Sequence, residues 1–294
     1  MNRLQPNAST PPPVLLLVGH GAKHALGTQQ FHQAAREVAG ILPDRTVESC
    51  FLEHAQPSFP EVIERIAAGT ARTVTVCPVL LFAAGHAKQD VPALIQEARS
   101  RFPRLTFRQA DVLNDHPRLV ELSALRRREA MDNVSSVPND ASIPRGSTVR
   151  VLIGRGSREP DAFENLSRFA SADLPRATDL NDTGDSSRKA DWNDAGDSRG
   201  EGDALEVGFI AMARPTLSEA LRAAANSHHD RVIVQPHFLF SGALSDRLRD
   251  EVLEFSRTRD DQEWILADVL GPHPLLAEAI RDRALEAEAP TPAE

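Results

Sequence analysis

The sequence predicts an α/β protein with two tandem domains, each a parallel four-stranded sheet flanked by helices. Three observations predict this fold. Short apolar runs alternate with segments of helical spacing, the alternation occurs four times, and the same order then begins again. At 294 residues, of which 41% are hydrophobic and 26% charged, the chain is long enough for two cores of ordinary size.

The first strand is expected at residues 14–18, an apolar run that follows three prolines and stops at Gly19. Such a run fits a strand buried on both faces of a parallel sheet. The first helix places Phe31, Ala35 and Val38 on one face. In all, the first half is expected to hold strands at 14–18, 47–53, 73–82 and 105–110 and helices at 25–42, 57–67, 89–101 and 116–129.

The second half repeats the first beyond the predicted elements. Residues 14–21 align with 149–156, and residues 76–82 align with 234–240. The matched residues include Pro57 with Pro215, Pro78 with Pro236, and His116 with His273. Similarity that recurs in the same order along the chain indicates a duplicated domain.

Two polar segments fall outside the repeat and set the domain boundaries. Residues 132–148 are rich in Asn, Ser, Pro and Gly and are expected to link the halves. Residues 179–203 carry too little apolar surface to order themselves, so a disordered insertion is expected there. The predicted organisation is a flexible N-terminus at 1–13, a first domain at 14–131, the linker, and a second domain at 149–294.

Composition excludes several classes of protein. The formal net charge of −9 argues against a nucleic-acid or membrane-surface binder, which needs a broad basic face. Cys50 and Cys77 are the only cysteines, and both are expected to be buried apolar residues rather than parts of a disulfide or cluster. Because the chain shows no signal peptide and no membrane-length apolar run, the cytoplasm is the expected compartment.

Two histidines follow predicted strands at the edge where open α/β sheets bind ligands. His20 follows the first strand and His86 the third, each beside glycine, and Glu53 ends the strand between the other two. A lone histidine at a strand end is usually structural, so the pairing is the informative feature. The corresponding residues of the second half are Arg155, Ala211 and Leu244. Positions kept in one half only are candidates for function, so the predicted site lies in the first half.

The other histidines are expected to have structural or surface roles. His116 and His273 occur in both halves ahead of a helix and are assigned to local structure. The remaining unmatched ones, His24, His32, His54, His228 and His229, are expected to face solvent, although His54 directly follows Glu53 and merits substitution.

Competing site signatures are absent. His24 stands where the dinucleotide fingerprint needs its third glycine, and the chain has no GxSxG or Walker sequence, so no nucleotide is expected. Two imidazoles and a carboxylate can bind a divalent metal ion, transfer protons, or do both.

These residues resemble those of the CbiX and SirB family of class II chelatases, which act on sirohydrochlorin. The resemblance covers residues 14–129 well and 149–286 in diluted form. Its motifs are Val18-Gly19-His20-Gly21, Phe51-Leu52-Glu53 with Gln56-Pro57-Ser58, and residues 76–86 with Asp90 and Pro92. Ala22 departs from the serine that the family commonly has, and the absence of a cysteine-bearing tail implies no iron–sulfur cluster.

The resemblance implies insertion of Co²⁺, Fe²⁺ or Ni²⁺ into a tetrapyrrole, in cobalamin or siroheme biosynthesis. His20 and His86 would bind the ion and accept pyrrole protons, and Glu53 would orient an imidazole, complete the metal shell or take up a proton. The substrate carries many carboxylates. Lys23 and Lys88 follow His20 and His86 by three and two residues, so they are expected to contact substrate carboxylates.

Single-domain members of the family are thought to form homodimers around the cleft. The second half of this chain is therefore expected to be a fused pseudo-subunit of a monomer, which walls the cleft without chemistry of its own. Two alternatives stay open: a metal or tetrapyrrole carrier without turnover, and a hydrolase or phosphatase with His20 as nucleophile, which would need an arginine cluster around His20.

Overall fold

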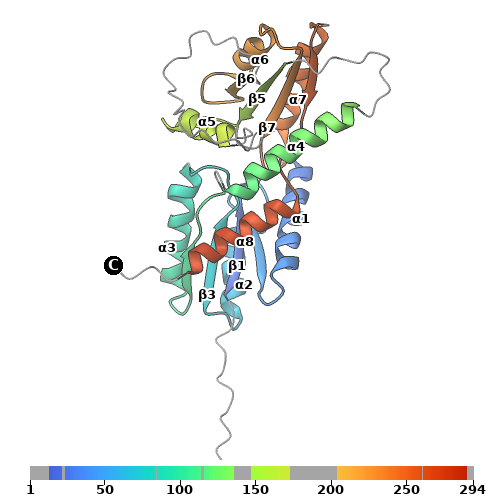
Figure 1. The fold of residues 1–294 in the computed structure, drawn as a ribbon. Coiled ribbons are helices and arrows are strands. Elements are labelled where there is room, and N and C mark those ends of the chain that lie inside the picture. The colour runs from blue at the N-terminus through green and yellow to red at the C-terminus, as the bar shows by residue number, and fades with distance from the viewer. Residues whose placement is uncertain are drawn as a thin grey trace, which may run out of the picture.

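The computed structural model describes residues 13–21, 24–83, 85–113, 116–135, 147–172, 204–259 and 261–289. It contains two parallel four-stranded sheets, with strand orders β2-β1-β3-β4 and β6-β5-β7-β8. We call the first sheet with the helices that cover it lobe 1, and the second lobe 2 (Figure 1). The predicted α/β fold of two tandem four-stranded sheets is confirmed. The segments 1–12 and 179–203, expected to be flexible, lie outside the described residues.

The elements of the first half are β1 (Val14–Gly19), α1 (Ala25–Ile41), β2 (Val47–Phe51), α2 (Phe59–Ala68), β3 (Thr73–Pro78), η1 (His86–Asp90), α3 (Val91–Arg101), β4 (Thr106–Gln109) and α4 (Pro117–Ser135). Those of the second half are β5 (Thr148–Gly154), α5 (Ala162–Ala172), β6 (Ala204–Phe209), α6 (Leu217–Ala225), β7 (Arg231–His237), α7 (Ala243–Arg257), β8 (Glu263–Leu266) and α8 (Pro274–Glu288).

Several bounds differ from the sequence prediction. Helix α4 runs to Ser135, so the first residues of the linker expected at 132–148 are helical. Two further differences have a clear physical reason. The strand expected at 73–82 ends at Pro78, because its neighbour β1 ends at Gly19 and leaves the following residues without a strand to pair with. The helix expected at 57–67 begins at Phe59, because Ser58 caps it: the Ser58 N–H donates to the Glu61 carboxylate at 2.7 Å.

The two halves repeat each other down to their hydrogen bonds. Helix α6 begins with the same capping box as α2, in which Thr216 and Glu219 take the places of Ser58 and Glu61. His116 and His273 cap α4 and α8: their Nδ1 atoms accept from the backbone N–H groups of Arg118 and Leu275 at 3.2 and 3.1 Å. Their assignment to local structure is confirmed.

Each sheet has helices of its own half on one face. In lobe 1, α2 and α3 cover the face that carries Leu16 and Val18. In lobe 2, α6 and α7 cover the face that carries Val151 and Ile153. Cys50 and Cys77 are buried in lobe 1, as expected, and burial raises the pKa of each thiol to about 12.

The last helix of each half packs on the sheet of the other half. Helix α8 covers α1, β3 and β4 of lobe 1, with Leu276 and Ile280 completely buried in the core that holds Leu15 and Leu17. Helix α4 reaches β8 of lobe 2, where Ala130 packs against Ile265. Figure 1 shows the two helices side by side as they cross between the lobes. The repeat in sequence and the lobes in space therefore differ by this exchanged pair.

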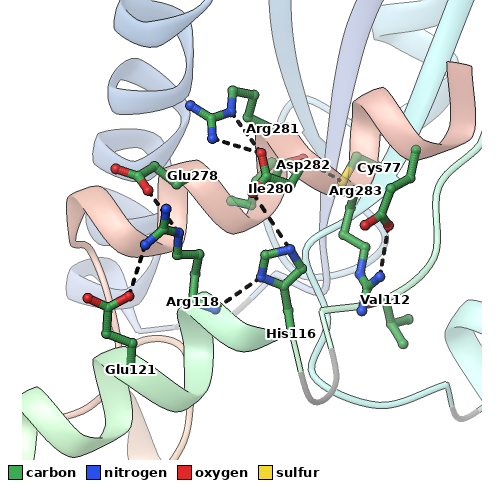
Figure 2. A network of polar contacts seen from close by, with 11 residues as sticks. Cys77, Val112, His116, Arg118, Glu121, Glu278, Ile280, Arg281, Asp282 and Arg283 are labelled. Atoms are coloured by element: carbon green, nitrogen blue, oxygen red, sulfur yellow. Dashed lines mark hydrogen bonds and ion pairs between the residues drawn. The ribbon is translucent and has the colours of Figure 1, made fainter. Parts of the chain in front are cut away.

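Polar contacts fix the exchanged pair of helices against each other (Figure 2). Arg118 of α4 pairs with Glu121 at 3.0 Å and with Glu278 of α8 at 3.1 Å. The buried His116 ring lies 3.8 Å from the Asp282 carboxylate. Arg283 of α8 donates to the Val112 carbonyl at 3.0 Å, so α8 is bound to the chain on both sides of His116.

Candidate functional site

A cleft of about 390 Å³ lies between the lobes, at the carboxyl ends of the strands of both sheets. Lobe 1 contributes the residues after β1 and β3, and lobe 2 those after β5 and β7. Much of its wall is apolar, including Phe31, Phe51, Leu81, Leu239 and Phe240. This is the position that open α/β sheets use for ligands, and its size suits a small molecule.

The loop after β1 holds His20 on the cleft wall. Gly21 has a φ of +89°, and a Cβ there would lie 1.7 Å from the Glu53 carbonyl oxygen, so only glycine fits. The Glu53 N–H donates to the His20 carbonyl at 3.0 Å. A backbone hydrogen bond therefore holds the loops after β1 and β2 together.

His54 is exposed, as expected, and its ring also contacts this pair. Its Nε2 lies 3.2 Å from the Glu53 carboxylate, and its ring centroid lies 6.4 Å from that of His20 in an edge-on arrangement. The backbone of His54 is left-handed, with a φ of +59°, and its side chain is 45% exposed. Glu53 can thus orient one imidazole directly, and that imidazole is His54.

The sheet order places the three predicted residues on adjacent strands. The middle strand is β1, which leads to His20, with β2 and Glu53 on one side and β3, which leads to His86, on the other. His86 begins η1, a π-helical turn, and its side chain lies outside the described structure. Among the described residues, no three His, Cys, Asp or Glu side chains converge on one metal position. The metal set His20, Glu53 and His86 therefore stays a prediction.

The structure describes one of the two lysines that are predicted to contact substrate carboxylates. Lys23 lies outside the described residues. The Lys88 ammonium lies 3.5 Å from the carboxylate of Glu159, a lobe 2 residue on the cleft wall. Lys88 is thus already paired across the lobes, and its contact with substrate stays a prediction.

Lobe 2 has the same strand-end loops with different side chains. The Ala211 N–H donates to the Arg155 carbonyl at 3.0 Å, as Glu53 does to His20. Gly156 has a φ of +83° and approaches the Ala211 carbonyl as Gly21 approaches that of Glu53. Met212, the counterpart of His54, shares its φ of +59°. Backbone geometry is preserved, and the imidazole–carboxylate cluster is absent from these positions.

A buried histidine in lobe 2 was missed by the sequence analysis. His237 ends β7, lines the cleft and contacts the rings of Phe82 and Phe169 at centroid distances of 5.3 and 4.1 Å. Neither ring nitrogen has a hydrogen-bond partner, and burial lowers the pKa of His237 to about 3. A histidine in the last position of an apolar strand was the available signal, since His20 was found in this way.

Fold and site together define a two-lobed α/β protein with a ligand cleft, in which one lobe carries an imidazole–carboxylate cluster. The family model for CbiX matches residues 14–130 and 185–287, and the chain belongs to this family. The expected family membership is therefore confirmed.

Characterised relatives match most of the chain. It is 28% identical to a sirohydrochlorin cobaltochelatase of Priestia megaterium, over 92% of this chain and 79% of the relative. It is also 28% identical to a sirohydrochlorin ferrochelatase of the same organism, over 90% and 86% of the two chains. The crystal structure of SirB from Bacillus subtilis with Fe³⁺ has the same fold, with a TM-score of 0.73, 21% identity and coverage of 94% and 96%.

Proposed function

We propose that this protein inserts a divalent metal ion, cobalt or iron, into sirohydrochlorin or a closely related tetrapyrrole. The observation that carries the proposal is His20, which the loop after β1 holds on the wall of a ligand-sized cleft in a chain of the CbiX family. Relatives of both metal specificities match the chain over comparable lengths, and nickel would suit imidazole ligands as well.

The chemistry requires a base close to the ring centre, because two pyrrole protons leave as the metal enters. We assign this to His20 and His86 as neutral imidazoles that bind the incoming ion and accept protons. Glu53 has three candidate roles, and its contact with His54 supports proton uptake or orientation of an imidazole. In this proposal residues 14–131 carry the chemistry, and residues 149–286 complete the cleft as a fused pseudo-subunit of a cytoplasmic monomer. No helix in the described part of the chain could span a membrane.

The test uses the full chain with sirohydrochlorin and Co²⁺ or Fe²⁺, followed by the tetrapyrrole absorbance spectrum. An enzyme converts many equivalents of substrate, whereas a carrier without turnover yields at most one. His20→Ala and His86→Ala should each lower kcat by about 10²-fold or more. The matched control is His228→Ala, because His228 is exposed on lobe 2 and does not line the cleft.

The hydrolase alternative finds little support. Arg155 is the one arginine among the described residues of the cleft wall, and one arginine is not the cluster that a phosphate would require.

Full activity of His20→Ala would contradict the proposed function, because this substitution removes the residue on which the proposal depends.

A further inference from the structure

The charges on the cleft wall are few and unevenly distributed. Among the described residues that line it, Arg155 is the one arginine or lysine. The acidic residues of the wall are Glu159 and Asp161, both on lobe 2. Glu159 pairs with Lys88, and the Asp161 backbone carbonyl accepts from Asn165 at the start of α5. Arg155 is exposed and makes no ion pair with any described residue.

The position of Arg155 is fixed by the repeat. Its backbone follows β5 as that of His20 follows β1, with the same hydrogen bond to the neighbouring loop and the same left-handed glycine after it. Both residues line one cleft, His20 from lobe 1 and Arg155 from lobe 2. A ligand that fills the cleft can therefore meet His20 from lobe 1 and Arg155 from lobe 2.

We infer that Arg155 binds a peripheral carboxylate of the tetrapyrrole and so makes lobe 2 a substrate-positioning lobe. The inference rests on the proposed function, because it takes its ligand from there. A guanidinium binds a carboxylate through two parallel N–H donors, and such charge-assisted bonds are about twice as strong as neutral ones. An acidic protein with a polycarboxylate substrate needs such a local cation.

The first test measures binding without metal or turnover. The full chain is titrated with uroporphyrin, a stable polycarboxylate porphyrin, and the porphyrin absorbance and fluorescence are followed. Arg155→Ala should raise Kd by about tenfold or more, because a charge-assisted contact is lost. The Kd of Arg155→Lys should fall between those of the wild type and Arg155→Ala, because lysine keeps the charge but lacks the two parallel N–H donors. Arg158→Ala is the matched control, since Arg158 is exposed three residues away and is not on the cleft wall.

The second test separates positioning from structure. With sirohydrochlorin and Co²⁺, Arg155→Ala should raise the KM for the tetrapyrrole by about tenfold. Its kcat, its KM for metal and its thermal unfolding midpoint should stay at wild-type values. A fall in kcat alone, or a lower unfolding midpoint with unchanged Kd, would contradict the inference.

The outcomes also distinguish this inference from the proposed function. If the wild type inserts metal but Arg155→Ala keeps wild-type Kd and KM, the inference fails and the function stands. If the wild type binds uroporphyrin through Arg155 but never turns over, the function fails and the carboxylate contact stands.

Discussion

The loops after β1 and β5 show how one backbone can serve two chemical purposes. Both loops have a left-handed glycine and accept the same hydrogen bond from the neighbouring strand-end loop. In that neighbouring loop, the residue directly after the donor is left-handed in both lobes. The loops of lobe 1 carry His20, Glu53 and His54, and those of lobe 2 carry Arg155, Ala211 and Met212. The backbone of these loops is therefore the same in both lobes, whereas the side chains that could take part in chemistry differ.

The first way to break this comparison is to separate the two halves of the chain. A chain that ends at Met131 keeps every strand of lobe 1 but lacks α8, whose Leu276 and Ile280 are completely buried. Exposing each side chain costs about 1.5–3 kcal/mol, a large part of a domain's total stability. The fragment should be aggregated or unfolded by circular dichroism and size-exclusion chromatography. Coexpression with residues 132–294 should restore a folded complex. A soluble, monomeric and fully active fragment would show that the second half of the chain is dispensable.

A second prediction compares the two glycines directly. Gly21→Ala and Gly156→Ala should each destabilise the protein by about 3 kcal/mol, because the new Cβ meets a backbone carbonyl at 1.7 and 2.0 Å. Chemical denaturation should therefore give similar losses for both variants. Metal insertion should fall more in Gly21→Ala, because only that loop holds His20. Equal loss of activity at matched folded fractions would argue that both loops act in chemistry.

The third prediction concerns His237, which occupies the place of Val79 in lobe 1. Its pKa of about 3 lies below the ordinary 6.5, so between these values the unfolded chain binds a proton at this residue and the folded chain does not. Stability is therefore lost as the pH falls below 6.5, at about 1.4 kcal/mol per unit. His237→Leu should remove about 2 kcal/mol of this loss at pH 5 and change stability little at pH 7.5 in urea unfolding. The same substitution at exposed His228 should leave the pH dependence unchanged.

The smallest effect is expected for the pair that bridges the lobes. Lys88 and Glu159 are 50% and 38% exposed, so the pair should contribute about 0.5 kcal/mol or less in a double-mutant cycle. Lys88→Ala should accordingly leave the unfolding midpoint unchanged. A severalfold rise in the KM for the tetrapyrrole in this variant would support the carboxylate contact predicted for Lys88.

The fold could be predicted because the spacing of hydrophobic residues and the similarity of the two halves can both be seen in the sequence without knowing which elements are in contact. Residues 14–18 indicated a buried strand without any knowledge of its neighbours, and the second copy confirmed the pattern. The exchange of α4 and α8 could not be predicted, because an apolar helix face shows that a helix packs and not on which sheet. The two sheets offer similar surfaces, and the direction of the chain between them decides the partner.

Sequence identified the cleft histidine that stands between two glycines, and it missed the one that has no glycine beside it. His20 was found from the flanking glycines and the strand before it. His237 follows Pro236 with no glycine on either side, so nothing comparable marked it in the sequence. His54 is exposed as expected, but sequence does not reveal the left-handed turn that brings its ring to Glu53.

The exchanged helices also constrain how the chain can be completed on the ribosome. The strands of lobe 1 are translated first, yet one face of their sheet awaits α8, the last helix of the described chain. Thr75 of β3 donates to Glu288 at 2.6 Å, across 213 residues of sequence. Contacts this distant in sequence slow folding, and an uncovered apolar sheet invites aggregation. Leu15 and Leu17 therefore lack their α8 neighbours, Leu276 and Ile280, until the end of the described chain has been made, and α1 covers them only in part before then.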